Sequence, residues 1–213
     1  MVRKTSVDGF IEVRQYLFGG NNDINGNGMI DESTMTRELV DRARNLDSEA
    51  FGQLYDMYYD NIYKYTYFKC GNQADAEDLA SQVFTGALRT IQNFSWREAT
   101  FASWLFRIAH NVVVDHWRKR GQGATEPIEN HIGIADGTDV ARTVVKSLQY
   151  EKVRLAMGLL AEDQSQVLTL RFINGLSIQE TAAALGKTAG AIKAQQFRAV
   201  AKLRELLVGE VDE

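Results

Sequence analysis

Residues 164–207 hold three helical segments in an order that fits one compact unit, the helix-turn-helix. Ser177, followed by Glu180 three residues later, forms a capping box that opens the second segment. Gly186 ends this short segment, because glycine readily adopts the left-handed conformation found at helix ends. A Lys-Thr turn then leads into a long third segment. A short helix, a tight turn and a long basic helix predict that the third segment enters the major groove of DNA.

Both helices of this unit have an apolar face that can pack against the rest of the domain. Ile178, Ala182 and Leu185 lie at positions i, i+4 and i+7 of the short helix. The long helix repeats this period and carries basic residues on its other face, with Ile192, Val200, Leu203 and Leu207 apolar and Lys193, Arg198 and Lys202 basic.

The charge distribution supports DNA binding by this unit more than by the whole chain. The net charge is −4, yet residues 164–204 contain six basic residues and one acid, Glu180. Because neutralisation of phosphates supplies most of the affinity for DNA, we expect weak binding by the chain alone and a partner that delivers it to DNA.

Composition limits the class of protein further. A single proline favours an all-α fold, and a single cysteine, Cys70, excludes an internal disulfide or a cysteine zinc cluster. We find no apolar window that could span a membrane and no signal-peptide core, so we expect a cytoplasmic protein without membrane insertion. His110, His116 and His131 are scattered along the chain, and no nucleophile–base pair or metal triad accompanies them. We therefore expect no enzyme.

The chain divides into four parts. Residues 1–36 form an N-terminal extension with a Gly/Asn-rich centre, and residues 37–120 form a first helical domain. Residues 121–147 contain the only proline and many glycines, which is typical of a flexible linker. Residues 148–213 contain the helix-turn-helix. The sequence thus predicts an all-α protein of two small helical domains joined by a flexible linker.

In the first domain, residues 47–69 are predicted to form a helix whose aromatic stripe faces the core. The core positions expected from this period are Phe51, Leu54, Tyr55, Tyr58, Ile62 and Tyr65.

Residues 73–92 form a second predicted helix, which Asn72 opens and which carries acids in its first turn. A polar stripe runs along one side of this helix and includes Asp75, Asp78, Gln82 and Arg89. The stripe is either a solvated face or a docking surface for a partner helix.

Residues 100–119 form a third predicted helix, with Phe101, Leu105, Ile108 and Val112 on its buried face. Another side combines aromatic, amide and basic groups, which suits stacking on bases and binding of phosphates, although a core tryptophan and a cation-favouring helix end explain the same residues. The residues of this side are Trp104, Arg107, Asn111 and Arg118, followed by Lys119 and Arg120.

The loop before this helix holds two aromatic residues and an arginine, Phe94, Trp96 and Arg97. These rings either cradle an unstacked base or pin the loop to the core.

Together these parts resemble a sigma factor of bacterial RNA polymerase, of the extracytoplasmic-function group. The resemblance covers residues 45–120 (region 2) and 148–207 (region 4). It depends on DSEAFGQLYDMYYDNIYKY, DAEDLASQVFTGAL and TFASWLFRIAHNVVVDHWRKR in region 2, and on DQSQVLTLRFINGLSIQETAAALGKTAGAIKAQQFRAVAKLREL in region 4. The presence of both blocks in this order, with a short linker, is highly specific.

The resemblance implies a protein that binds core RNA polymerase and promoter DNA, and an anti-sigma factor as a candidate partner. The second helix matches the segment that docks on the clamp helices of the largest polymerase subunit, with Asp75, Asp78, Gln82, Phe84 and Arg89 as candidates. The surface that captures the melted minus-ten strand corresponds to Phe94, Trp96, Arg97, Trp104, Arg107, Asn111, Arg118, Lys119 and Arg120. The part that reads the minus-thirty-five element corresponds to Lys187, Thr188, Lys193, Gln195, Gln196, Arg198 and Lys202.

Two positions depart from the family pattern. The Leu-Pro that usually precedes region 4 is Leu160-Ala161 here, and we expect Asp163 to cap the helix instead. Ala191 stands where a threonine is more usual, which removes a candidate phosphate contact. Gln195 and Gln196 are candidate base readers, because glutamine can pair bidentately with adenine.

The extension contains a partial calcium loop. Asp23, Asn25, Asn27 and Asp31 match early positions of an EF-hand loop, but Thr34 replaces the closing glutamate. Weakly bound calcium is therefore the one cofactor that the sequence suggests, and a flexible Asn/Gly loop explains the same residues.

A stand-alone transcriptional regulator that binds duplex DNA without polymerase is the alternative function. Such a regulator would need dimer symmetry, and no dimerisation helix is found in the sequence. A calcium-sensing interaction protein is a third class, and it depends on the incomplete loop alone.

Overall fold

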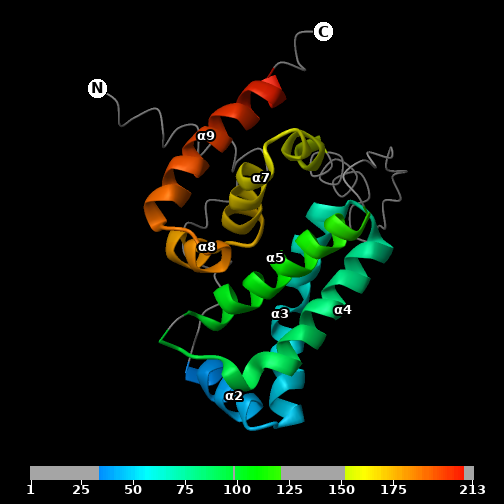
Figure 1. Cartoon of the computed structure of the whole chain (residues 1–213), viewed down its shortest axis with the longest axis vertical. Coiled ribbons are helices and arrows are strands. Elements are labelled where there is room, and N and C mark those ends of the chain that lie inside the picture. The colour runs from blue at the N-terminus through cyan, green and yellow to red at the C-terminus, as the bar shows by residue number, and fades with distance from the viewer. Residues whose placement is uncertain (1–33, 98, 121–151, 209–213) are drawn as a thin grey trace, which may run out of the picture.

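The computed structural model describes residues 34–97, 99–120 and 152–208, which are helical and contain no strand (Figure 1). The all-α prediction is thus confirmed for these residues. The first domain contains α2 (Thr34–Arg44), α3 (Ser48–Cys70), α4 (Gln73–Thr90), a 3₁₀ turn η1 (Ile91–Asn93) and α5 (Phe101–Arg120). The second contains a helix over residues 152–158, α7 (Glu162–Leu168), a π-helical turn η2 (Thr169–Ile173), α8 (Ile178–Leu185) and α9 (Ala189–Val208).

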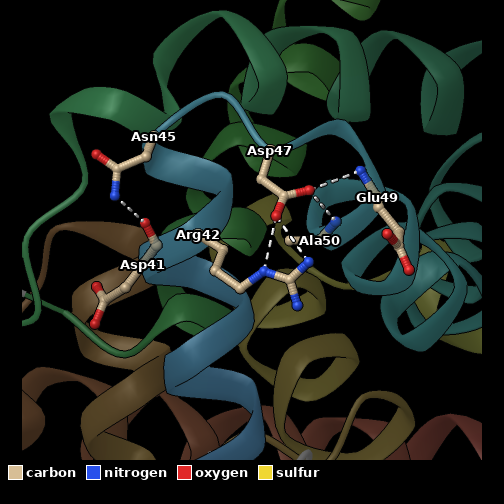
Figure 2. A network of polar contacts seen from close by, with 6 residues as sticks. All are labelled: Asp41, Arg42, Asn45, Asp47, Glu49 and Ala50. Atoms are coloured by element: carbon tan, nitrogen blue, oxygen red, sulfur yellow. Dashed lines mark hydrogen bonds and ion pairs between the residues drawn. The ribbon is translucent and has the colours of Figure 1, made fainter.

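A polar network fixes the corner between α2 and α3 (Figure 2). Asp47 caps α3, and its Oδ1 accepts hydrogen bonds from the backbone N–H groups of Glu49 (3.0 Å) and Ala50 (3.1 Å). Its Oδ2 accepts a bond of 2.7 Å from Nε of Arg42. The bond from Ala50 and then the Arg42 guanidinium lower the pKa of the Asp47 carboxyl. One side chain therefore both starts α3 and holds the end of α2.

Leu46, in the same corner, has a left-handed backbone with φ of 66°. Its N–H donates to the Ala43 carbonyl (3.0 Å), and the N–H of Asp47 donates to the Arg42 carbonyl (3.2 Å). This pairing closes a helix end in which glycine is the usual residue. The Leu46 side chain is 68% exposed, so it adds little packing to offset the strained backbone.

The core of the first domain follows the predicted period of α3 closely. Leu54, Tyr58, Ile62 and Tyr65 are fully buried, as expected. Phe51 and Tyr55 are exceptions, because Phe51 is half-buried and Tyr55 is 37% exposed.

The predicted buried face of α5 is only partly right. Phe101 and Leu105 are buried, whereas Ile108 and Val112 are half-buried. The α5 helix is covered on two sides, by α3 and α4 and by α8 of the second domain. The additional buried positions are Ala102, Ser103, Phe106, Ala109 and Val113.

The helix-turn-helix forms as its sequence predicts. The N–H of Glu180 donates to Oγ of Ser177 (3.1 Å), and the N–H of Ser177 donates to Oε2 of Glu180 (2.7 Å). Gly186 ends α8 with φ of 63°. The predicted cap of α7 is wrong, because Ala161 precedes the helix without a side-chain bond and Asp163 lies within the first turn. The Asp163 carboxylate instead reaches another part of the domain.

The two domains pack directly against each other, which the sequence did not predict. Phe68 of α3 lies in the apolar cluster of the second domain, and Leu170 and Leu176 lie in that of the first. In Figure 1, α8 accordingly lies beside α5. Nδ2 of Asn174 donates to the Asn61 carbonyl over 2.7 Å. The domains therefore share a continuous interface in this structure.

An ion pair adds to this interface. Nζ of Lys69 lies 2.7 Å from Oε1 of Glu162, with the Lys69 side chain 5% exposed and that of Glu162 63% exposed. A second polar contact also joins the two domains, since the Thr100 hydroxyl lies 3.4 Å from Oε1 of Glu180. The buried ammonium of the first domain thus has its anionic partner in the second.

Candidate nucleic-acid and partner-binding surfaces

The polar stripe of α4 faces solvent. Asn72 opens the helix by accepting from the N–H of Asp75 (2.9 Å) and donating to its carboxylate (2.8 Å), which leaves Asp75 half-buried. Asp78, Gln82 and Arg89 are exposed, and Nε2 of Gln82 donates to Oδ2 of Asp78 (2.7 Å). The stripe therefore presents an ordered acid–amide pair with an arginine at the far end of the helix.

Phe84 does not belong to this surface, and its assignment as a partner-binding residue is corrected. The ring is 5% exposed, with ring centroids of Tyr55 at 4.5 Å and Tyr59 at 6.4 Å. These tyrosines of α3 cover it, so the half-exposed Tyr55 is what a partner on this side would meet.

A cleft of about 290 Å³ separates α4 from the C-terminal half of α5. Gln82 lines one wall, and Val112, Asp115, His116 and Lys119 line the rest. The α4 stripe and the basic end of α5 therefore border the same cleft, although they were predicted as separate sets.

The aromatic loop before α5 is pinned to the core. Phe94 is 2% exposed and packs against Phe101 (5.8 Å between centroids) and Trp104 (5.3 Å). Of the two explanations from sequence, the pinned loop is the one that this structure contains. Phe94 is too deeply buried to stack on a base here, and that part of its assignment is corrected.

Trp96 is half-buried and held by α2. Its Nε1 donates to Oδ1 of Asp41 (3.2 Å), and the guanidinium of Arg37 lies 5.2 Å from its ring centroid. Such a cation–π contact helps to hold the half-buried ring in place. Arg97, the next residue, is exposed. This loop thus presents the half-buried ring of Trp96 and the exposed guanidinium of Arg97 to a ligand.

The predicted face of α5 remains open beside the loop. Trp104 is half-buried against Phe94 and Phe101, while Arg107 and Asn111 are exposed. Further along, Arg118 forms an ion pair of 3.0 Å with Asp115, and Lys119 is exposed. Arg120 ends the helix, and its side chain lies outside the described part of the structure.

The recognition helix α9 exposes three of its predicted basic residues. Lys193 and Arg198 project into solvent, and Lys202 forms an ion pair of 3.0 Å with Glu205. Thr188 caps the helix, since its Oγ1 accepts from the N–H of Ala191 over 3.2 Å. This bond satisfies one backbone N–H group in the first turn of α9.

Gln195 and Gln196, the candidate base readers, are half-buried and already hydrogen-bonded within the domain. Gln195 donates to Asp163 over 3.0 Å, and Gln196 accepts from Nε of Arg171 over 2.9 Å. Lys187 contacts the same Asp163 oxygen at 2.6 Å. Their amide groups therefore have set orientations before any ligand binds.

Phe197 is a candidate contact that the sequence interpretation missed. It is 64% exposed, on the outer face of α9 together with the small residues Gly190, Ala194 and Ala201. A phenylalanine can contact the methyl group of thymine in the major groove. The sequence could have indicated this contact, because Phe197 does not share the apolar face of Ile192 and is therefore expected outside the core.

No cluster of three potential metal ligands is found among the described residues, and no helix there is long and apolar enough to cross a membrane. The partial calcium loop at Asp23, Asn25, Asn27 and Asp31 lies outside the described residues.

Comparison with known proteins gives two family matches on these domains. Residues 54–122 match Sigma-70 region 2, and residues 150–203 match Sigma-70, region 4. The chain is 40% identical over 181 residues to the ECF RNA polymerase sigma factor BldN of Streptomyces coelicolor. The aligned residues cover 83% of this chain and 67% of that protein. It is 32% identical over 164 residues to SigX of Bacillus subtilis, over 74% of this chain and 83% of that protein.

A solved structure of CnrH in complex with the cytosolic domain of CnrY is also similar, with a TM-score of 0.64 and 25% identity over 84% of this chain and 99% of that one. The two matched regions stand in the order and on the helices that the resemblance predicted. The chain therefore belongs to the extracytoplasmic-function (ECF) sigma factors of RNA polymerase.

Proposed function

We propose that this chain binds core RNA polymerase and directs transcription initiation at specific promoters, with all bond-forming chemistry left to the polymerase. Three surfaces that this function needs, on α4, α5 and α9, are open to solvent in a chain that belongs to the sigma family. This coexistence of three open surfaces on separate helices is the observation that carries the proposal.

The α4 stripe is the proposed docking site for the clamp helices of the largest subunit. Asp78 and Gln82 form a preset pair of 2.7 Å, and Arg89 lies two turns further along the helix. A rigid helix that presents acids, an amide and a cation suits recognition of another charged helix, because complementary charges favour the correct register.

The surface around Trp96, Trp104, Arg107 and Asn111 is the proposed site for the melted minus-ten strand. Single-stranded DNA is held by rings on which bases stack and by cations that follow the backbone. Trp96 and Trp104 are half-buried, so each is rigid and still offers part of its ring. Arg97, Arg107 and Lys119 supply exposed positive charge on the same domain.

The α9 helix is the proposed reader of the minus-thirty-five element. Lys193 and Arg198 are exposed for phosphate or base contacts, and Phe197 lies between them on the outer face. The capped N-terminus at Thr188 adds the positive end of the helix dipole, which favours a phosphate.

Simultaneous use of both readers requires the domains to separate. Two promoter elements centred 25 base pairs apart are about 85 Å from each other along B-DNA, whereas the two domains share a packed interface here. Residues 121–151 are long enough, since a chain of that length spans about 100 Å when extended. Binding to polymerase is therefore proposed to open the interface.

A reconstituted transcription assay tests this function. Core polymerase with the purified chain, on fragmented genomic DNA, should yield transcripts from a small set of start sites that share upstream sequences. Asp78→Lys should weaken polymerase binding at least ten-fold, because it reverses a charge in the docking stripe. Asp56→Lys, the same change on an exposed position of α3, is the matched control and should bind normally.

The competing function is a regulator that acts without polymerase. Tight sequence-specific binding to duplex DNA by the chain alone, together with no polymerase-dependent transcripts, would establish that function and refute this one. An anti-sigma factor stays a candidate partner, and the similar CnrH was itself solved with the cytosolic domain of CnrY.

A further inference from the structure

Three side chains from three different elements meet at the base of the recognition helix. Oδ2 of Asp163, on α7, lies 2.6 Å from Nζ of Lys187 in the helix-turn-helix turn. The same oxygen accepts a bond of 3.0 Å from Nε2 of Gln195 on α9. Nζ of Lys187 also lies 3.5 Å from Oε1 of Gln195, which closes the triangle.

We propose that Asp163 is a positioning residue that sets the DNA selectivity of the second domain, acting through Lys187 and Gln195. This inference rests on the proposed function of α9 as a promoter reader. Asp163 does not cap α7 and is 60% exposed. An acid in the first turn suits the helix dipole, but the dipole does not require one carboxylate oxygen to lie within 3.0 Å of both Lys187 and Gln195.

The first effect of Asp163 is to restrain the charge of Lys187. A phosphate that approaches the turn must compete with a carboxylate already 2.6 Å from the ammonium. Each phosphate neutralised by a free lysine makes the salt dependence of DNA affinity steeper by about 0.9 in log K against log salt. A restrained lysine contributes less than this, so contacts with arbitrary DNA are weakened.

The second effect is to orient the amide of Gln195. Its NH₂ group points to Asp163 and its oxygen lies toward Lys187. A glutamine pairs with adenine through both its amide oxygen and its NH₂ group. This pairing forms in only one of the two orientations that differ by a flip of the amide. The remaining amide hydrogen and oxygen lone pair are therefore offered to DNA in a fixed arrangement.

Two substitutions separate charge from orientation. Asp163→Asn keeps an oxygen that can accept from Lys187 and Gln195 but removes the negative charge. Asp163→Ala removes both. The side chain is 60% exposed, so both variants should fold, and thermal unfolding monitored by circular dichroism checks this.

The first measurement is binding of the full-length chain to a labelled 30-base-pair duplex of arbitrary sequence between 50 and 200 mM salt. Asp163→Asn and Asp163→Ala should both steepen the salt slope, by at most about 0.9, which is a greater loss of affinity of at most about 3.5-fold over this range. In a Lys187→Ala background, Asp163→Asn should leave the slope unchanged. Asp56→Asn, an equal charge change on α3, should also leave it unchanged.

The second measurement is transcription by the holoenzyme from an identified promoter and from the same promoter with a scrambled upstream element. Asp163→Ala should reduce the ratio of the two signals at least three-fold, and Asp163→Asn should retain more of this discrimination than Asp163→Ala.

Equal salt slopes for wild type and Asp163→Asn would overturn the inference. A failure of both proteins to bind the duplex would also overturn it. A slope increase that persists without the Lys187 ammonium would do the same. Promoter-specific transcription by the wild-type holoenzyme would still support the proposed function in either case, so the two failures are distinguishable.

Discussion

The ion pair between Lys69 and Glu162 should control how readily the two domains separate. Its charges lie 2.7 Å apart, which corresponds to about 6 kcal/mol at an effective dielectric constant of 20 and about 1.5 kcal/mol in bulk water. Glu162 is 63% exposed, so the lower figure is the better guide. The entropy of ordering both side chains reduces it to about 1 kcal/mol.

Removal of the two charges should have unequal effects. Glu162→Gln leaves the Lys69 ammonium, which is 5% exposed, without an anionic partner in the closed state. Separation of the domains would hydrate it, so the ratio of open to closed molecules should rise about five-fold for about 1 kcal/mol. Lys69→Met leaves only an exposed carboxylate and should not open the domains, because the apolar stem still packs. The double variant should resemble Lys69→Met.

Single-molecule energy transfer measures this ratio. Cysteines introduced at the exposed positions Thr85 in α4 and Ala201 in α9 can carry the dyes. The native Cys70 is buried, and burial raises its thiol pKa to about 11, so it should resist labelling at neutral pH. Equal opening by Lys69→Met and Glu162→Gln would refute the reasoning, since it would mean that the buried charge carries no desolvation penalty.

Three further perturbations test local features of the fold. Leu46→Gly should raise the free energy of unfolding by about 1 kcal/mol in urea, because it relieves a left-handed backbone at an exposed residue; no gain, or an equal gain from Leu46→Ala, would contradict this. Ser177→Ala should lower that free energy by about 1 kcal/mol through loss of the capping box, and an unchanged urea midpoint would count against it. Burial, and then Lys69 and Lys187, lower the pKa of His110 below its ordinary value of 6.5. His110 therefore binds a proton more readily in the unfolded state than in the folded state. The stability that it contributes is complete above the pKa of the unfolded state and is lost as pH falls through the lowered pKa of the folded state. The urea midpoint should fall less between pH 7.5 and pH 5.5 in His110→Gln than in wild type; equal losses would exclude this role.

Features that depend on residues close together in the chain were predictable from sequence. The capping box of Ser177 and Glu180 and the glycine stop at Gly186 occur as predicted, because each needs only a bond within one turn of helix. Asn72 opens α4 for the same reason. The buried period of α3 was also clear, since its apolar residues recur on one face.

Positions where one helix meets several neighbours were not predictable in the same way. A period identifies an apolar face but not its edges. Tyr55 was expected in the core and is 37% exposed, and Phe84 was named as a partner contact and is 5% exposed. From sequence, Phe94 could either contact an unstacked base or pin its loop to the core. Only its packing against Phe101 and Trp104 distinguishes these two explanations.

The sequence by itself determined the family, the helices and their caps, because these depend on local patterns and on two long motifs. The tertiary structure decided the domain interface and the cluster at Asp163. Lys69 and Glu162, and likewise Asp163 and Gln195, are far apart in the chain. A contact between such residues adds no periodic signal to the sequence, because it arises only when separately folded helices pack against each other.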